Sequence, residues 1–186
     1  MRFKSTRRLS RSSGAVLALA GAALLLGPAV ARAELGKPYD AQVQLGPSLG
    51  VNDAPGQLHL GLEFGANTDE QLSLVLPFEL GLGGGITRVQ FEPGVEGHLR
   101  LVSGVPLYLV PRAGVGLGVL THCCSGTGSN AALALNLGTE LRYVIKENVA
   151  QASFQPLRLD VYPVGTNQSG AAPIWYAILF GLTANL

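Results

Sequence analysis

Lysine is scarce in this sequence: after the first 33 residues, only Lys37 and Lys146 occur. Neither lysine lies within a stretch of alternating residues that predicts a strand. Soluble sheet proteins usually protect their wet face and their edge strands with lysine. The scarcity therefore argues against an ordinary soluble sheet protein.

Cysteine is equally rare, and its two copies, Cys123 and Cys124, are adjacent. Adjacent cysteines can form a vicinal disulfide, link two chains or stay free, and together with His122 they make a poor metal cage. An exported chain favours an oxidised form, so we expect a possible disulfide at Cys123 and Cys124 whose partner is open. We expect no metal and no other cofactor.

Recognisable catalytic motifs are also missing, because no serine sits in a nucleophile motif. His59 and His98 lie near Glu63 and Glu96 in sequence, and a histidine–carboxylate pair can act as a general base. Such an enzyme also needs a nucleophile or a second catalytic group. We therefore expect the protein not to be an enzyme.

The first 33 residues are typical of a signal peptide. Five basic residues precede the apolar run 15–26, and Ala31-Arg32-Ala33 supplies a small-x-small site, so cleavage is expected between Ala33 and Glu34. A retained helical anchor is the alternative, and Pro28 argues against it. The domain organisation is then a removed leader, 1–33, and one mature domain, 34–186. The leader holds six of the 13 basic residues and none of the 12 acidic ones, so seven basic residues remain and the mature net charge is −5. This charge gives no reason to expect nucleic-acid binding.

A two-residue alternation is the strongest positive signal. Between Gln71 and Leu82, leucines and one phenylalanine alternate with Gln71, Ser73, Val75, Pro77, Glu79 and Gly81. Successive side chains of a strand leave on opposite faces, so the stretch predicts one strand with a continuous apolar stripe. A stripe of about eleven residues suits a tilted strand that crosses the hydrocarbon core of a bilayer.

Eight strands of this kind can be predicted. The links between them are mostly too short for parallel crossovers, which indicates an antiparallel meander. The seventh strand is irregular, and we expect a bulge near Pro156. Prolines inside strands remove ladder donors and speak against the assignment; they stand at positions 47, 77, 93, 111 and 156. The strands are expected at 39–51, 58–65, 71–82, 86–101, 107–119, 133–143, 154–162 and 174–186, with the longest link at 121–130.

In this pattern the chain resembles the small eight-stranded bacterial outer-membrane β-barrels of the OmpA/OmpX type. The resemblance covers almost all of the mature sequence and contains no sharp motif. It implies an all-β fold, a closed antiparallel up-and-down transmembrane β-barrel of eight strands, in the outer membrane of a Gram-negative bacterium. It also implies insertion by the barrel-assembly machinery after export. Family members commonly end in an aromatic residue, whereas this chain ends in Leu186, which puts efficient assembly in doubt.

The resemblance further implies that both termini lie on the periplasmic side. The links at 52–55, 83–85, 121–130 and 166–173 are then expected outside the cell. The links at 67–70, 103–104 and 146–148 are expected in the periplasm.

The polar face of the predicted strands would line the lumen of such a barrel. Buried charges are tolerated when they are paired and hydrogen-bonded, and the interior of an eight-stranded barrel is about wide enough for side chains alone. We therefore expect a plug of charged side chains. Its members are Asp40, His59, Glu63, Glu79, Arg88, Glu92, Glu96, His98, Arg100, Arg112, Glu140, Arg142, Arg158 and Asp160.

The sequence thus favours a non-enzymatic, envelope-structural outer-membrane protein. The expected partners are outer-membrane lipid and, during biogenesis, the export and barrel-assembly machinery, with no nucleic acid. Three alternatives stay open: a narrow ion- or small-solute-conducting channel, a lipid-modifying outer-membrane enzyme, and a secreted soluble β-barrel.

Overall fold

The computed structural model describes residues 37–52, 54–68, 71–122, 129–164 and 172–186. Within these ranges no helix is both long and apolar enough to cross a membrane. The predicted cleavage site at Ala33 and Glu34 and the pair Cys123 and Cys124 lie outside the described residues. The strand segments are β1 (Tyr39–Val51), β2 (Gln57–Asn67), β3 (Leu72–Gly83), β4 (Ile86–Phe91), β5 (Gly94–Gly97), β6 (Leu99–Arg100), β7 (Leu107–His122), β8 (Ser129–Lys146), β9 (Ala150–Val164) and β10 (Ile174–Asn185).

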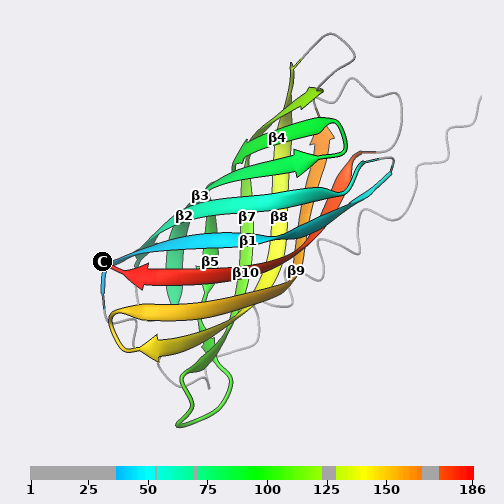
Figure 1. Cartoon of the computed structure of the whole chain (residues 1–186). Helices are drawn as coiled ribbons and strands as arrows, with labels where there is room; N and C mark the ends of the chain where they lie inside the picture. The colour runs from blue at the N-terminus through cyan, green and yellow to red at the C-terminus, as the bar shows by residue number, and fades with distance from the viewer. Residues whose placement is uncertain (1–36, 53, 69–70, 123–128, 165–171) are drawn as a thin grey trace, which may run out of the picture. The chain divides into compact units, whose positions relative to one another are not determined.

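The strands form a closed antiparallel ring. Neighbouring strands pair around the ring, and β1 pairs with β10 from Asp40↔Asn185 to Val51↔Ile174, so the first and last strands lie side by side (Figure 1). The segments β4, β5 and β6 together occupy one position in the ring between β3 and β7. The ring therefore has eight positions, which confirms the predicted fold class.

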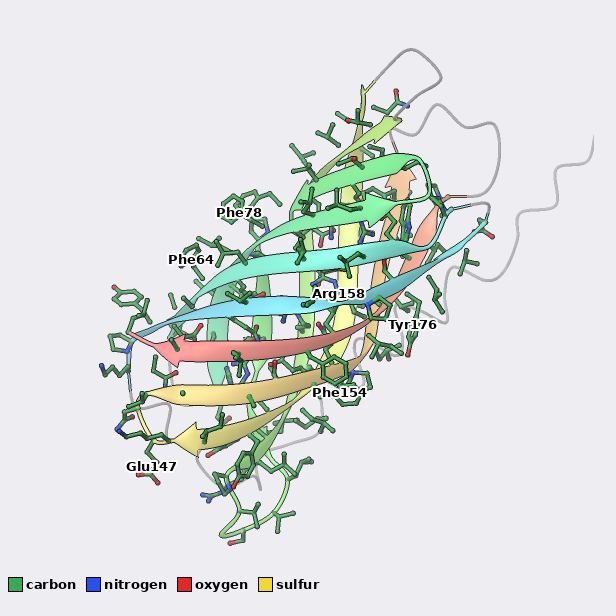
Figure 2. The ribbon with its side chains drawn as sticks, viewed as in Figure 1. Phe64, Phe78, Glu147, Phe154, Arg158 and Tyr176 are labelled. Carbon is green, nitrogen blue, oxygen red and sulfur yellow. The ribbon has the colours of Figure 1, made fainter. Side chains whose placement is uncertain are left out.

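The predicted alternation decides which side chains face the lumen. In β1, Val43, Leu45 and Leu49 are exposed on the outside, whereas Gln42 and Gln44 are buried inside. Figure 2 shows the same division elsewhere: Phe64 and Phe78 point away from the sheet, and the buried Arg158 lies within the ring. A soluble sheet protein buries its leucines, so this arrangement contradicts the secreted soluble alternative.

Three predicted strands are longer in the structure. β7 continues to His122 and β8 begins at Ser129, so the predicted link 121–130 is too long, and β9 begins at Ala150 rather than at Phe154. Thr121 pairs with Ser129, and Ala150 pairs with Ala184. The added residues are mostly small or polar, so their alternation is weaker than that of the leucine-rich strands; in β9, Gln151, Ser153 and Gln155 are nevertheless buried inside the ring.

Prolines interrupt the fourth predicted strand, 86–101. Residues 92–93 separate β4 from β5 and lie opposite Pro77, between the pairs Phe78↔Phe91 and Val75↔Gly94. The gap between β5 and β6 lies opposite Pro111, between the pairs Glu96↔Arg112 and Leu99↔Leu109. A proline has no N–H to give to a neighbouring strand, so the ladder breaks where prolines face it.

The last two prolines mark breaks beside β10. Pairing of β1 with β10 stops after Leu45↔Phe180 and resumes at Ser48↔Ala177, so Pro47 lies outside this ladder, whereas on its other side it is opposite Leu58 of β2. In β9, residues 156–157 oppose Ile178 alone, so the predicted bulge near Pro156 is confirmed. All five prolines thus lie at register interruptions, which explains how a barrel holds so many.

A tyrosine hydroxyl satisfies the bulge at Pro156. Tyr176 on β10 donates its O–H to the carbonyl oxygen of Pro156. In hydrocarbon a bulge carbonyl finds no water, so an internal donor has to replace the missing ladder bond. Figure 2 shows the Tyr176 and Phe154 side chains on the outside of the ring near this point.

We predict that Tyr176→Phe destabilises the barrel by about 1 kcal/mol, the usual net value of one hydrogen bond. Urea titration of the barrel in lipid, followed by the gel-mobility difference between folded and unfolded chains, measures the change. Tyr39→Phe is the control, since Tyr39 is 59% exposed at the start of β1. Equal unfolding midpoints for the two variants would contradict the role given to the Tyr176 hydroxyl.

Candidate functional site in the barrel lumen

Thirteen of the fourteen predicted lumen residues are buried inside the ring. The exception is Arg100, which is partly exposed at the end of β6 and donates from Nε to the carbonyl oxygen of Val105 at 3.3 Å. β6 has two residues and ends beside the turn that contains Val105. Arg100 therefore reaches the rim of the barrel and not the contacts described below.

The first group of contacts, here named the Arg142 cluster, consists of Glu63, Glu96, Arg112, Glu140 and Arg142. Arg142 binds both carboxylate oxygens of Glu96, at 3.0 and 3.2 Å, and its Nε donates to Glu140 at 2.8 Å. Arg112 contacts Glu63 and lies 3.9 Å from Glu140. Two arginines on β7 and β8 thus tie together carboxylates from β2, β5 and β8.

Two glutamines that were not predicted as network members complete the Arg142 cluster. Gln42 donates to Glu140 at 3.0 Å and to the hydroxyl of Ser153 at 2.8 Å, and Gln44 donates to Glu140 at 3.3 Å. Both lie on the inward phase of β1, where the alternation places them beside Asp40. Their position on the inward phase of β1 could have identified them from the sequence, but only ionisable residues were included in the predicted network.

The second group, the Arg158 cluster, consists of Glu79, Arg88, Glu92, Arg158 and Asp160. Arg158 donates to Glu79 at 2.5 Å, to Glu92 at 3.0 Å and, through Nε, to Asp160 at 2.9 Å. Arg88 lies 3.2 Å from Asp160. Neutral side chains again fill the remaining positions: Gln90 donates to Glu79, Asn136 donates to Glu92, and Tyr162 donates to Gln90.

His59 contacts members of the Arg158 cluster and not Glu63. Its Nδ1 lies 3.1 Å from Nη2 of Arg88, and its Nε2 lies 3.4 Å from Glu79. A guanidinium group only donates hydrogen bonds, so Nδ1 is the acceptor and a neutral ring carries its proton on Nε2. The pairing of His59 with a carboxylate was predicted from Glu63, which instead contacts Arg112.

This tautomer bears on metal binding. His59, Glu79 and Asp160 place one donor atom each within 4.8 Å of one another, which is close enough to surround an ion. However, Nε2 of His59 keeps its proton, and Arg88 and Arg158 already bind the two carboxylates. The group offers no free nitrogen lone pair, and two cations lie beside it, so the geometry does not fit a metal site.

His98 lies in a hydrogen-bonded chain on the side of the lumen nearest the start of β1. Asn67 donates to the carbonyl oxygen of Lys37 at 2.7 Å, which turns its amide oxygen toward Ser73. The Ser73 hydroxyl donates to that oxygen at 2.5 Å and lies 2.9 Å from Nε2 of His98. Ser73 has one proton and gives it to Asn67, so Nε2 of His98 is the donor and the serine is not activated as a nucleophile.

An apolar and aromatic group, here named the lid, is buried in the lumen beside the turn at 54–56. Trp175, 1% exposed, donates from Nε1 to the carbonyl oxygen of Pro55 at 2.9 Å, and its ring meets that of Tyr162 edge-on at 5.4 Å. Arg88 of the Arg158 cluster lies 4.8 Å from the indole centre. The lid consists of Leu120, Ala132, Ala134, Tyr162 and Trp175, with Ala54 packed against it.

The lid was not anticipated from the sequence. Trp175 lies between Ile174 and Tyr176, which were assigned to the outward face, so its inward direction followed from the phase of β10. Tyr162 likewise follows Arg158 and Asp160 on the inward face. Its place needs Gly118 on β7, because a Cβ there would stand 2.5 Å from the Tyr162 ring.

The described lumen carries more acidic than basic groups. Seven carboxylates are buried in it, Asp40 and Asp160 together with five glutamates, against four arginines. Several buried polar atoms, among them Nε of Arg112 and both amide atoms of Gln155, have no protein partner. Buried polar atoms of this kind usually bind internal water, so the lumen is expected to hold water molecules between its side chains.

No protein-family model matches the sequence, and no curated protein matches it significantly. Among solved structures, Neisserial surface protein A (NspA) superposes with a TM-score of 0.65 at 9% identity, over 80% of this chain and 97% of that one. The N-terminal β-barrel domain of Pseudomonas aeruginosa OprF gives 0.57 at 18% identity, over 79% and 97%. The outer membrane enzyme PagL gives 0.50 at 15% identity, over 76% and 97%. These likenesses show that the chain has the fold of the small outer-membrane β-barrels.

Proposed function

We propose that the protein is an integral outer-membrane barrel of a Gram-negative envelope, non-enzymatic and structural in role. The observation that carries this proposal is the division of the ring into an apolar outside and a lumen filled by the Arg142 and Arg158 clusters. A surface of leucine, valine and phenylalanine fits lipid tails, and paired side chains leave little free space inside. Its partners are then outer-membrane lipid and, during biogenesis, the export and assembly machinery.

Fractionation of cells that express the full chain tests the location. We expect the mature protein in the outer-membrane fraction, with an N-terminus at Glu34 and a mobility on gels that shifts on boiling. Recovery of the protein from the periplasm or the medium, with no heat-dependent shift, would refute the proposal. Because these readouts do not depend on conductance, they separate the membrane location from the state of the lumen.

A narrow channel is the second candidate function, and the charge excess of the lumen favours it. Three carboxylates more than arginines, and polar atoms free to bind water, are what a cation path requires. Planar-bilayer recording of the refolded protein distinguishes the two. A silent wild-type barrel supports the structural plug, and steady conductance steps would favour the channel.

A lipid-modifying enzyme is less well supported. PagL, an outer membrane enzyme, shares the fold, but Ser73 and His98 of this chain lie buried in the lumen with the serine proton given to Asn67. Such a serine does not reach lipid, and its only imidazole neighbour among the described residues, His98, faces it with the nitrogen assigned as the hydrogen-bond donor. Comparison of the lipids of cells with and without the protein is the test, and a difference that disappears on Ser73→Ala would overturn this interpretation.

A further inference from the structure

The turn between β6 and β7 differs in composition from the other turns at its end of the ring. Its residues 101–106, here named the apolar turn, read Leu-Val-Ser-Gly-Val-Pro and include no charged side chain. The link between β2 and β3 has Asp69 and Glu70 in its sequence, and the turn between β8 and β9 has Lys146 and Glu147. The antiparallel order brings these three pairs of strand ends to the same end of the ring as the C-terminus (Figure 1). Two of the three links are therefore suited to water, and the apolar turn is not.

The apolar side chains of this turn are exposed. Leu101, Val102 and Val105 are between 39 and 49% exposed, and Leu62, in the middle of the lipid-facing side of β2, is 43% exposed. Exposed apolar side chains in this number, in a turn of six residues, call for a partner other than water.

The exposed side chains of the turn continue the outward face of the ring. Leu99 of β6 pairs with Leu109 of β7, and next to this pair Leu101 donates its backbone N–H to the carbonyl oxygen of Leu107. Because alternate residues of a strand share a face, these leucines follow one another on the outside of the ring. The lipid-facing surface of the barrel thus extends into the apolar turn without a polar side chain between them.

The register also shows how far the turn extends. Leu107, the partner of Leu101, pairs with Tyr143 of β8, an exposed tyrosine of the kind that marks a membrane interface. Val102 extends one residue beyond this level, about 3 Å at the rise of a β-strand. The headgroup region of a bilayer is about 5–7 Å thick on each side, so Val102 lies within its depth.

A basic side chain lies beside the apolar turn. Arg100 is partly exposed at the rim of the barrel, and its Nε donates to the carbonyl oxygen of Val105 at 3.3 Å. Among the described contacts the two terminal nitrogens of this guanidinium group have no partner. A guanidinium group binds a phosphate group through two parallel hydrogen bonds, and the phosphates of phospholipids lie in the headgroup region.

We propose that the apolar turn binds phospholipid, with its leucine and valines against the upper part of the acyl chains and Arg100 at a phosphate group. The inference rests on the proposed membrane-spanning barrel and goes beyond it, because it places one turn within the headgroup region and names the lipid groups that it contacts. A turn held in this way fixes one side of the barrel at the membrane surface, whereas the two charged links at the same end favour water.

Tryptophan fluorescence of the refolded barrel in phosphatidylcholine vesicles that contain phosphatidylglycerol tests the depth of the turn. Val102→Trp and Glu147→Trp are compared after subtraction of the signal of the unchanged protein, whose Trp175 is buried. We expect Val102→Trp to lose fluorescence to lipid brominated near the headgroup end of its acyl chains and to resist iodide. Glu147→Trp should respond to iodide and not to the brominated lipid, because Glu147 lies four residues beyond Tyr143, about 13 Å along the strand.

Leu62→Trp separates this inference from the proposed membrane location. If lipid brominated deep in its acyl chains quenches Leu62→Trp, but Val102→Trp responds only to iodide, the lipid contact of the turn is refuted and the barrel stands. If brominated lipid quenches neither variant, the membrane barrel itself is refuted. Shielding of Val102→Trp from both quenchers would refute the lipid contact in favour of a second copy of the chain over the turn.

Arg100→Gln, added to Val102→Trp, tests the phosphate contact. Glutamine has no charge and cannot bind a phosphate group as an ion pair, so iodide should quench the double variant more strongly than Val102→Trp alone. Equal quenching of the two proteins would refute the role given to Arg100.

Discussion

Replacement of Arg158 by methionine is expected to prevent refolding of the barrel or to lower its stability by roughly 3–5 kcal/mol, the usual effect of removing one partner from a buried ion pair. Arg158 donates to Glu79, Glu92 and Asp160, and its side chain is completely buried. Without it, three carboxylates face one another with Arg88 as the only neighbouring guanidinium of the cluster. Urea titration in lipid, with the heat-dependent gel shift as the readout of folding, measures the loss.

Two further variants separate charge from packing. Arg100→Met removes the same side chain at the rim of the barrel, where Arg100 binds only the Val105 carbonyl among the described contacts, and should change stability little. Arg158→Met combined with Glu79→Gln and Glu92→Gln removes the uncompensated charge and should recover a large part of the loss. If the single and the triple variant were equally unstable, the clusters would not act through charge pairing.

The sequence was sufficient to predict the ring and its two faces, because alternation alone sorts side chains between lipid and lumen. It was not sufficient to predict which lumen residues meet. His59 shows the reason: Glu63 is four residues away on the same strand, about 13 Å at the rise of a β-strand. Glu79 stands on the neighbouring strand, where Gly61↔Glu79 and His59↔Gly81 are pairs, so the register places it diagonally beside His59. Register depends on the stagger of all eight strands and is not encoded near His59.

The lid and the prolines also show that the register between strands could not be predicted from the sequence. Trp175 and Tyr162 meet because the pair Asp160↔Trp175 sets the register of β9 against β10; the predicted hairpin brought the two strands together but did not fix this register. The five prolines seemed to oppose the strand assignment because each lacks a donor. The structure places the ladder interruptions at the prolines, so the missing donors fall where no ladder bond is made. The rule that proline cannot donate a ladder hydrogen bond was correct, and only the cross-strand pairing shows how this barrel accommodates it.

Replacement of Leu62 by arginine is expected to cost roughly 2–4 kcal/mol in a bilayer, the effect of a guanidinium at the midplane of an outer-membrane barrel. Leu62 lies at the middle of β2, and its side chain is 43% exposed on the outside of the ring. Tyr39→Arg, at the end of β1, is the matched control. Near the interface the same charge should cost only about 0–1 kcal/mol, because the long side chain reaches the headgroups.

The comparison of these two variants shows directly whether hydrocarbon or water surrounds the outer surface of the ring. On a soluble protein, arginine at an exposed position in mid-strand changes stability by about 0.5 kcal/mol or less, and it generally improves solubility. A steep dependence on depth, with Leu62→Arg far worse than Tyr39→Arg in lipid vesicles, requires hydrocarbon around the middle of the ring. Equal and small effects at both positions would place water there, and the exposed leucines, valines and phenylalanines would then have to be covered by another protein. The depth profile therefore tests the physical premise from which the filled lumen and its paired charges follow.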